Sequence, residues 1–158
     1  MPTCPITELP GHLAKGARLL GLDLGDKTIG LALSDPGLTV ASPIDTIRRA
    51  KFTRDAEALI LIVRDRGVGG LVIGLPVNMD GTEGPRCQST RQFAANLLTK
   101  IDIPIAFWDE RLSTAAVERL LTDEADMTRA RRGQVVDKMA AAYILQGALD
   151  MMANAARR

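Results

Sequence analysis

Residues 18–25 of this chain read Arg-Leu-Leu-Gly-Leu-Asp-Leu-Gly, and this stretch decides the fold. Leucine at every second position predicts a β-strand with one apolar face, and the opposite face carries Asp23 between two glycines. A carboxylate in a core strand is expensive to remove from water unless it has a partner. The glycines lack side chains, so we expect them to leave room for a ligand to approach the backbone. Asp23 is therefore the first candidate functional residue.

Two further acids lie in apolar segments much later in the chain. Glu110 closes the run Ile-Ala-Phe-Trp-Asp-Glu at 105–110, and Asp137 stands in Val-Val-Asp-Lys-Met-Ala-Ala-Ala at 135–142. Apolar residues follow Asp137 at offsets of three and four, which predicts that it lies on the apolar stripe of a helix. Three acids in core elements suggest one shared partner, and a divalent metal ion fits them best.

Each acid also has a competing structural explanation. Glu110 can cap the next helix or pair with the adjacent Arg111, and Asp137 can stabilise the N-terminus of its own helix. Arginines just before Asp137 suit a helix N-terminus poorly, so we favour a functional role there. Asp23, in a central strand, has nothing obvious to cap, and function is the stronger interpretation.

The composition bounds the class of protein. With 158 residues, of which 46% are hydrophobic and 25% charged, the chain is typical of one soluble globular domain. The formal net charge of +1 provides no global attraction to nucleic acid, so any basic surface must be local. No apolar run approaches the roughly 20 residues that cross a bilayer, and we expect no membrane association.

The cysteines and the single histidine disfavour several mechanisms. Cys4 and His12 lie in the N-terminal segment and Cys87 in a polar stretch, which predicts reduced thiols in a cytoplasmic protein. A zinc site built from His and Cys, or a Ser-His-Asp or Cys-His triad, is therefore disfavoured. The chemistry that remains uses oxygen ligands.

The apolar pattern predicts strands that alternate with helices. We expect strands at 18–25, 28–34, 39–47 and 70–76 and one ending at 110, and helices at 56–66, 90–101, from 113 or 114 onward, and at 132–152. Short turns between the first three strands indicate an antiparallel meander, and the strand at 70–76, apolar on both faces, is typical of a covered parallel strand. The expected product is a mixed α/β sheet with helices on both faces, in one domain at 18–152 between a loose tail at 1–17 and another at 153–158.

The motifs around the acids, taken together, are specific. They are Gly-Leu-Asp-Leu-Gly-Asp-Lys-Thr-Ile-Gly at 21–30, Ser-Asp at 34–35, Gly-Leu-Pro at 74–76 with Asp-Gly at 80–81, Asp-Glu-Arg-Leu-Ser-Thr at 109–114, and Asp-Lys-Met-Ala-Ala at 137–141 with Ile-Leu-Gln at 144–146. In order and spacing this series resembles the YqgF/RuvX family of Holliday junction resolvases. The resemblance covers about residues 18–150.

The resemblance implies both a fold and an activity. The fold would be the ribonuclease H-like three-layer fold, a mixed five-stranded sheet of order 3-2-1-4-5 with strand 2 antiparallel. Family members are implicated in trimming the 5′ end of the precursor of 16S ribosomal RNA, so the resemblance implies a nuclease of ribosome biogenesis. Asp23, Glu110 and Asp137 would be its catalytic acids. One departure is Thr28, where relatives often carry a second basic residue, and this weakens the case for a phosphate contact there.

Phosphodiester hydrolysis needs an activated water, neutralised phosphate oxygens and a stabilised leaving group. Two Mg²⁺ or Mn²⁺ ions about 3.5–4 Å apart supply all three when carboxylates hold them. Asp23 would bridge the ions, with Glu110 and Asp137 on either side. Asp35 and Asp109 are candidates to support these acids, but a turn residue and a salt-bridge partner are the simpler explanations.

Local basic groups would contact the nucleic acid. The candidates are Lys27, Arg111, Arg129, Arg131, Arg132 and Lys138. A second cluster at 48–54 is more typical of a solvated face, and the turn-rich loop at 74–81 is either a substrate-facing loop or a plain turn. Aromatic residues make up only 3% of the chain, so recognition of backbone and shape fits better than base stacking.

Several alternatives stay open on the sequence alone. The substrate could be a four-way DNA junction in recombination and repair rather than ribosomal RNA, and ribosomal particles are a further candidate partner. Symmetric junction cutting would need a homodimer, and the sequence leaves monomer and homodimer open.

An ATPase of the actin or sugar-kinase type is disfavoured because it needs a second such domain. A non-catalytic nucleic-acid-binding protein on the same fold would bind without cleaving.

Overall fold

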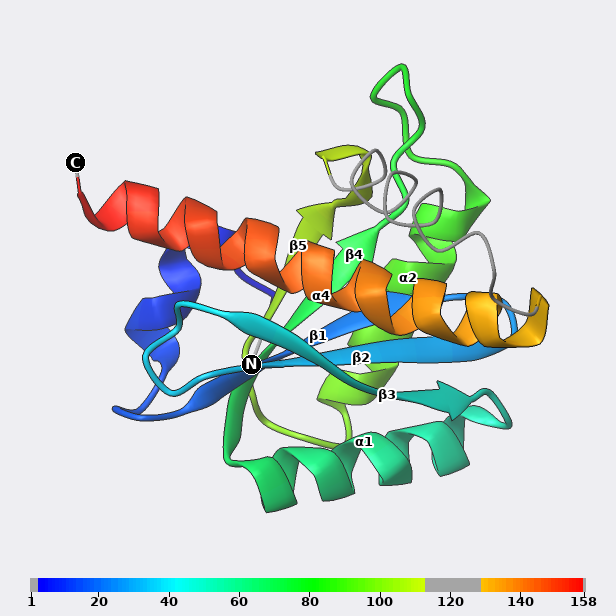
Figure 1. The fold of residues 1–158 in the computed structure, drawn as a ribbon, viewed down its shortest axis with the longest axis horizontal. Coiled ribbons are helices and arrows are strands. Elements are labelled where there is room, and N and C mark those ends of the chain that lie inside the picture. Colours follow the sequence, from blue (N-terminus) through cyan, green and yellow to red (C-terminus); the bar gives the residue numbers. More distant parts are fainter. Residues whose placement is uncertain (1–2, 113–128, 158) are drawn as a thin grey trace.

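The computed structural model describes the backbone of residues 3–112 and 129–157, and the side chains of 3–112 and 138–157 (Figure 1). Its elements are η1 (Ile6–His12), β1 (Arg18–Leu24), β2 (Thr28–Ser34), β3 (Ala41–Arg48), α1 (Phe52–Arg66), β4 (Val68–Leu75), α2 (Pro85–Leu98), β5 (Ile105–Asp109), η2 (Glu110–Leu112) and α4 (Arg129–Ala156). The five strands lie where the sequence predicts them. Helices α1, α2 and α4 begin earlier than expected, and α4 continues to Ala156, through most of the segment expected to be a loose C-terminal tail. The helix expected from residue 113 or 114 lies outside the described residues.

The sheet has the order β3-β2-β1-β4-β5, which confirms the expected topology. β2 is antiparallel to both of its neighbours, while β4 is parallel to both β1 and β5. Parallel strands end at the same edge of a sheet, so the carboxyl ends of β1, β4 and β5 lie together. This shared edge, called the carboxyl edge below, is where open α/β sheets bind ligands.

Helices cover both faces of the sheet, as expected (Figure 1). α4 runs across one face over β1, β2 and β3, and α1 and α2 cover the other. Two separate apolar cores result, one under α4 and one under α1 and α2. No helix in the described ranges 3–112 and 129–157 is long and apolar enough to cross a membrane.

Small residues let α4 approach the sheet closely. A Cβ placed on Gly21 would lie 2.8 Å from the Cβ of Leu145, and one placed on Gly147 would lie 2.5 Å from the Trp108 ring. The expectation that Gly21 leaves room for a ligand was therefore wrong, because the helix fills that space. Gln146 adds a polar anchor: its side chain accepts a hydrogen bond from the Ala41 amide (2.9 Å) and donates one to the Thr39 carbonyl (3.0 Å).

The N-terminal segment packs against the domain, where a loose tail was expected. In η1, Leu9 is fully buried and Ile6 nearly so, and both belong to the core under α4 or its margin. The Cys4 amide donates a hydrogen bond to the Ile105 carbonyl at 2.9 Å, so this segment lies along the outer edge of β5. Covering an edge strand in this way hides its free backbone groups from other chains.

Asp35 closes the connection between β2 and β3, which confirms the turn explanation for this acid. Its carboxylate accepts hydrogen bonds from the amides of Thr39 (2.7 Å) and Val40 (2.9 Å) and from the Thr39 hydroxyl (2.7 Å). The bonds from Val40 and then Thr39 lower the pKa of Asp35 from its usual 3.8 to about 2. Since β2 is antiparallel, this turn lies away from the carboxyl edge.

The lowered pKa of Asp35 predicts a defined acid sensitivity. A carboxylate with a depressed pKa in the folded state stabilises the fold above its unfolded pKa, and that stabilisation is lost as the pH falls. We expect the loss between about pH 4 and about pH 2. Urea unfolding at several pH values should show a flatter acid limb for Asp35→Asn than for the parent protein. Parallel curves over this window would contradict the assignment.

Candidate active site

Asp23 lies near the carboxyl end of the central strand β1, on the face that α4 covers. Strand residues alternate between faces, and Leu20 and Leu22 belong to the core under α1 and α2. Gly21 faces α4, so Asp23, two residues later, faces the same way. The side chain is partly buried, in agreement with the core-strand position expected from the sequence.

Glu110 reaches the same place from β5. It is the first residue of η2, directly after the strand, and its side chain turns back over β4. A Cβ placed on Gly74 would lie only 2.5 Å from Glu110 Oε1. Leu22 of β1 pairs with Ile73 of β4, so the next residues on the two strands, Asp23 and Gly74, are neighbours. The carboxylates of Asp23 and Glu110 therefore lie over adjacent positions at the carboxyl edge.

Asp137 belongs to α4, the helix that covers this face. It lies one turn before Ala141, whose carbonyl oxygen is 3.1 Å from a Cβ placed on Gly21. The side chain of Asp137 is outside the described residues, so its membership of the site stays a prediction. Among the side chains that are described, no group of three His, Cys, Asp or Glu residues is placed to hold a metal ion.

Asp109 and Arg111 form a tight pair beside Glu110. Arg111 Nη2 lies 2.6 Å from Asp109 Oδ2, and its Nε donates to both carboxylate oxygens at 3.0 Å. The bond from Arg111 lowers the pKa of Asp109, so this carboxylate stays ionised. The salt-bridge explanation for Asp109 is thereby confirmed. Arg111, a candidate for nucleic-acid contact, uses Nε and Nη2 on this partner, and its Nη1 donates to the carbonyls of Asn78 and Met79 at 3.4 Å.

The loop after β4 is built as a turn. Asp80 Oδ1 accepts hydrogen bonds from the Thr82 amide (3.0 Å) and hydroxyl (2.6 Å), and the Asn78 side chain donates to the same hydroxyl (3.0 Å). Gly81 has a φ of 90°, which favours glycine. Asn78 and Asp80 thus fold the loop onto itself, and Met79 is left exposed at its tip.

The other basic candidates are distributed around the carboxyl edge. Lys27 is exposed in the turn between β1 and β2, and Lys138 is half-buried on α4. Thr28 opens β2, and its carbonyl accepts the Gly25 amide at 2.9 Å. The predicted cluster of Arg129, Arg131 and Arg132 belongs to the first turns of α4, and their side chains are outside the described residues.

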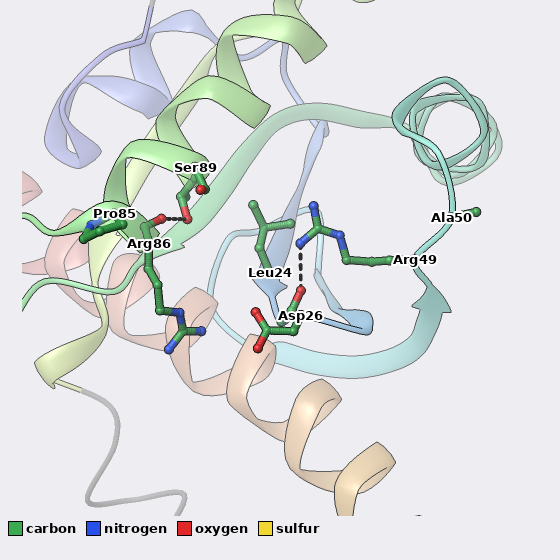
Figure 2. Close-up of a pocket in the computed structure, with 9 residues that line it drawn as sticks. Leu24, Asp26, Arg49, Ala50, Pro85, Arg86 and Ser89 are labelled. Carbon is green, nitrogen blue, oxygen red and sulfur yellow. Dashed lines mark hydrogen bonds between the residues drawn. The ribbon is translucent and has the colours of Figure 1, made fainter.

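A cleft of about 520 Å³ opens at the carboxyl edge beside Leu24 (Figure 2). Arg49 and Arg86 line it, although the sequence interpretation assigned Arg49 to a solvated face and missed Arg86. No local pattern could have found this pair, because the two residues are far apart in the chain. The order of the strands brings together the connection after β3 and the start of α2.

Comparison with known proteins places the chain in a family. The family described as "RuvX: Holliday junction resolvase" matches residues 17–151, which is most of the chain. The chain belongs to the RuvX family. The matched range contains all three predicted acids and every predicted basic contact.

Relatives of this RuvX chain match it over nearly the full length. A protein of Paramagnetospirillum magneticum named "Putative pre-16S rRNA nuclease" is 67% identical over 150 residues, which cover 95% of this chain and 96% of the relative. Proteins of the same name from Rhodospirillum centenum (64% identity; 93% and 80% covered) and Phenylobacterium zucineum (61%; 98% and 99%) are also similar.

The fold of this RuvX chain is also found among solved structures. Thermus thermophilus RuvC in complex with a Holliday junction substrate has a TM-score of 0.50 at 11% identity, with 86% of this chain and 96% of that chain covered. At this identity the likeness concerns the fold alone. Together with the sheet order, it identifies the RuvX chain as ribonuclease H-like, as the sequence resemblance implied.

Proposed function

We propose that this chain is a metal-dependent nuclease that hydrolyses phosphodiester bonds in the precursor of 16S ribosomal RNA. The observation that supports the proposal is that Glu110 turns back over Gly74, the neighbour of Asp23 on β4, at the carboxyl edge of the sheet. A divalent cation shared by neighbouring carboxylates would offset the repulsion between their charges. The named relatives, 61–67% identical over nearly the whole chain, support the RNA substrate.

The donor set suits Mg²⁺ or Mn²⁺. Asp23 and Glu110 offer hard carboxylate oxygens, which these ions prefer to nitrogen or sulfur. Asp137 would complete the set from α4, and three acids suffice for the two-ion site that we expect. When bound, such ions supply positive charge at the phosphate and acidify the attacking water.

The protein's own groups would position the reaction. Glu110 is fixed because Gly74 leaves space beneath it and because the Arg111–Asp109 pair holds the end of β5 in place. α4 covers the site from above the sheet and limits the access of water. Lys27, Lys138 and the arginines at 129–132 would hold the phosphate backbone around the acids. Residues placed on strands and helices keep such a geometry more tightly than residues on loops.

Removal of the metal tests the proposal. We expect cleavage of an RNA that carries the 5′ leader of 16S ribosomal RNA with Mg²⁺ or Mn²⁺, no cleavage in excess chelator, and no sustained cleavage with Ca²⁺, whose looser coordination fits the site poorly. Gel analysis of end-labelled RNA would measure the rate and the cut position. Full activity in chelator would contradict the metal assignment.

Resolution of four-way DNA junctions is the second candidate function. The description of the matched family favours it. A four-way DNA junction assayed beside the RNA separates the two functions, and symmetric cutting would additionally require a homodimer. Tight binding of both substrates without cleavage of either would instead indicate a nucleic-acid-binding protein, with ribosomal particles as its candidate partner.

A further inference from the structure

The cleft beside Leu24 lies on the far side of the β1 end from the acids. Asp23 faces α4, and Leu24, the next residue, faces the opposite layer and lines the cleft. Its other walls come from Gly25 and Asp26 after β1, from Arg49 after β3, and from Arg86 and Ser89 of α2. Figure 2 shows Arg49 and Arg86 extending toward the space around Asp26 from different elements. A substrate strand that crosses the carboxyl edge at the acids would next meet this cleft.

Arg49 is held in a fixed orientation. Its Nη1 donates a hydrogen bond to the Gly25 carbonyl at 2.7 Å, and its guanidinium carbon lies 5.7 Å from the centre of the Phe93 ring. Phe93 is itself held by an edge-on contact with Phe52. A guanidinium fixed in this way keeps further N–H donors in a planar fork that matches phosphate oxygens, and it loses little side-chain entropy when it binds them.

The two arginines of the cleft lack acidic partners within the described part of the chain, unlike their neighbours. Arg91 pairs with Glu83 at 2.7 Å, and Arg111 pairs with Asp109 at 2.6 Å. No ion pair of this kind joins Arg49 or Arg86 to a described carboxylate. The acid nearest to them along the wall is Asp26, so the lining carries two positive charges and one negative charge.

The start of α2 adds to the positive field of the cleft. The helix begins at Pro85 after Gly84, with no side chain capping its first amides. Pro85, Arg86 and Ser89 of these first turns line the cleft. Free amides at a helix N-terminus attract anions, and here they act together with the two arginines.

We propose that this cleft binds the phosphate backbone of the substrate strand next to the scissile phosphate. The inference rests on the proposed nuclease function and deepens it by assigning Arg49 and Arg86 as positioning residues. A backbone phosphate is favoured over a base because no aromatic face is open in the lining, the Phe93 ring being covered by Arg49. The volume of about 520 Å³ suits a group the size of a nucleotide.

Binding measured without metal tests the cleft directly. Arg49→Gln, Arg86→Gln and the double variant would be titrated into a fluorescent single-stranded RNA of about twelve nucleotides in chelator, at several salt concentrations. Each lost phosphate contact should reduce the slope of log affinity against log salt by about 0.7, and the double variant by about 1.4. Arg64→Gln is the matched control, since Arg64 is exposed at the end of α1, at the opposite edge of the sheet. Its slope should equal that of the parent protein.

The proposal would be overturned if the folded double variant had the same slope of log affinity against log salt as the parent protein. Arg49→Lys keeps the charge but loses the planar fork, so it should retain the slope and weaken the affinity. Adenosine monophosphate would be added as a competitor at the same nucleotide concentration as the RNA. If it displaces the RNA, the cleft binds a free nucleotide rather than the backbone of a strand, and the proposal would be overturned. A parent protein that cleaves no RNA would contradict the nuclease function and leave the slope test intact. With active enzyme, the double variant should raise KM and leave kcat nearly unchanged.

Discussion

Asp23→Asn or Glu110→Gln is expected to reduce single-turnover RNA cleavage by a factor on the order of 10³, with Asp137→Asn giving a similar loss. Each substitution keeps the volume of the side chain and removes the charge that a divalent ion requires. If the acids form one site, the double variant should cost little more than either single change, because residues that act as a unit are not additive. Quenched-flow cleavage at saturating enzyme would measure the effect.

Stability distinguishes this outcome from a structural role of the acids. Removing one of two adjacent carboxylates relieves repulsion, so the Tm measured without metal should stay the same or rise. A lower Tm with full activity per folded molecule would show that the acids are structural. Asp65→Asn on α1 provides the matched control, because Asp65 is exposed at the opposite edge of the sheet. It should change neither cleavage nor Tm.

Gly74→Ala is expected to reduce kcat by about 10²-fold, because it displaces the Glu110 carboxylate. The new Cβ would lie 2.5 Å from both Glu110 Oε1 and Ile144 Cδ1, so the carboxylate must move. A displacement of about 1 Å in a catalytic group can cost that much. The same crowding should lower the stability by about 1–3 kcal/mol. Cleavage rates and thermal melts of the same preparation would measure both effects.

Gly147→Ala separates the two effects of crowding. Its Cβ would lie 2.5 Å from the Trp108 ring, and its three nearest atoms all belong to that ring rather than to Glu110. Helix propensity would offset part of the strain, by up to about 1 kcal/mol. We expect a reduced Tm with unchanged activity per folded molecule. Full activity in Gly74→Ala would contradict the position assigned to Glu110.

The strands, and the places of Asp23 and Glu110 at strand ends, could be predicted because their signals are local. Alternating leucines around Asp23 and the apolar run before Glu110 each indicate one element, and the motif order then implied the strand order. The use of Gly21 could not be predicted in the same way. A glycine that admits a ligand and a glycine that admits a helix have the same local sequence, and only the packing of Leu145 distinguishes them.

Features that join distant segments were the ones missed. η1 has no long apolar run, yet Leu9 is fully buried because it packs against elements far along the chain. Arg49 and Arg86 are separated by α1 and β4, and neither has a motif around it. Such contacts form between segments that are far apart in the chain, so a pattern within one segment does not reveal them.

The position of α4 in the chain has a consequence for the order of folding. This helix follows every strand in sequence, yet it seals the face of β1, β2 and β3, and Gln146 ties it to the connection between β2 and β3. Until α4 docks, that face of the sheet is open to solvent. On the assignment proposed for Asp137, a growing chain would carry two acids early and acquire the third only with the final closure of the domain. Newly synthesised protein would thus be unable to cut RNA near the ribosome that makes it until its own folding is complete.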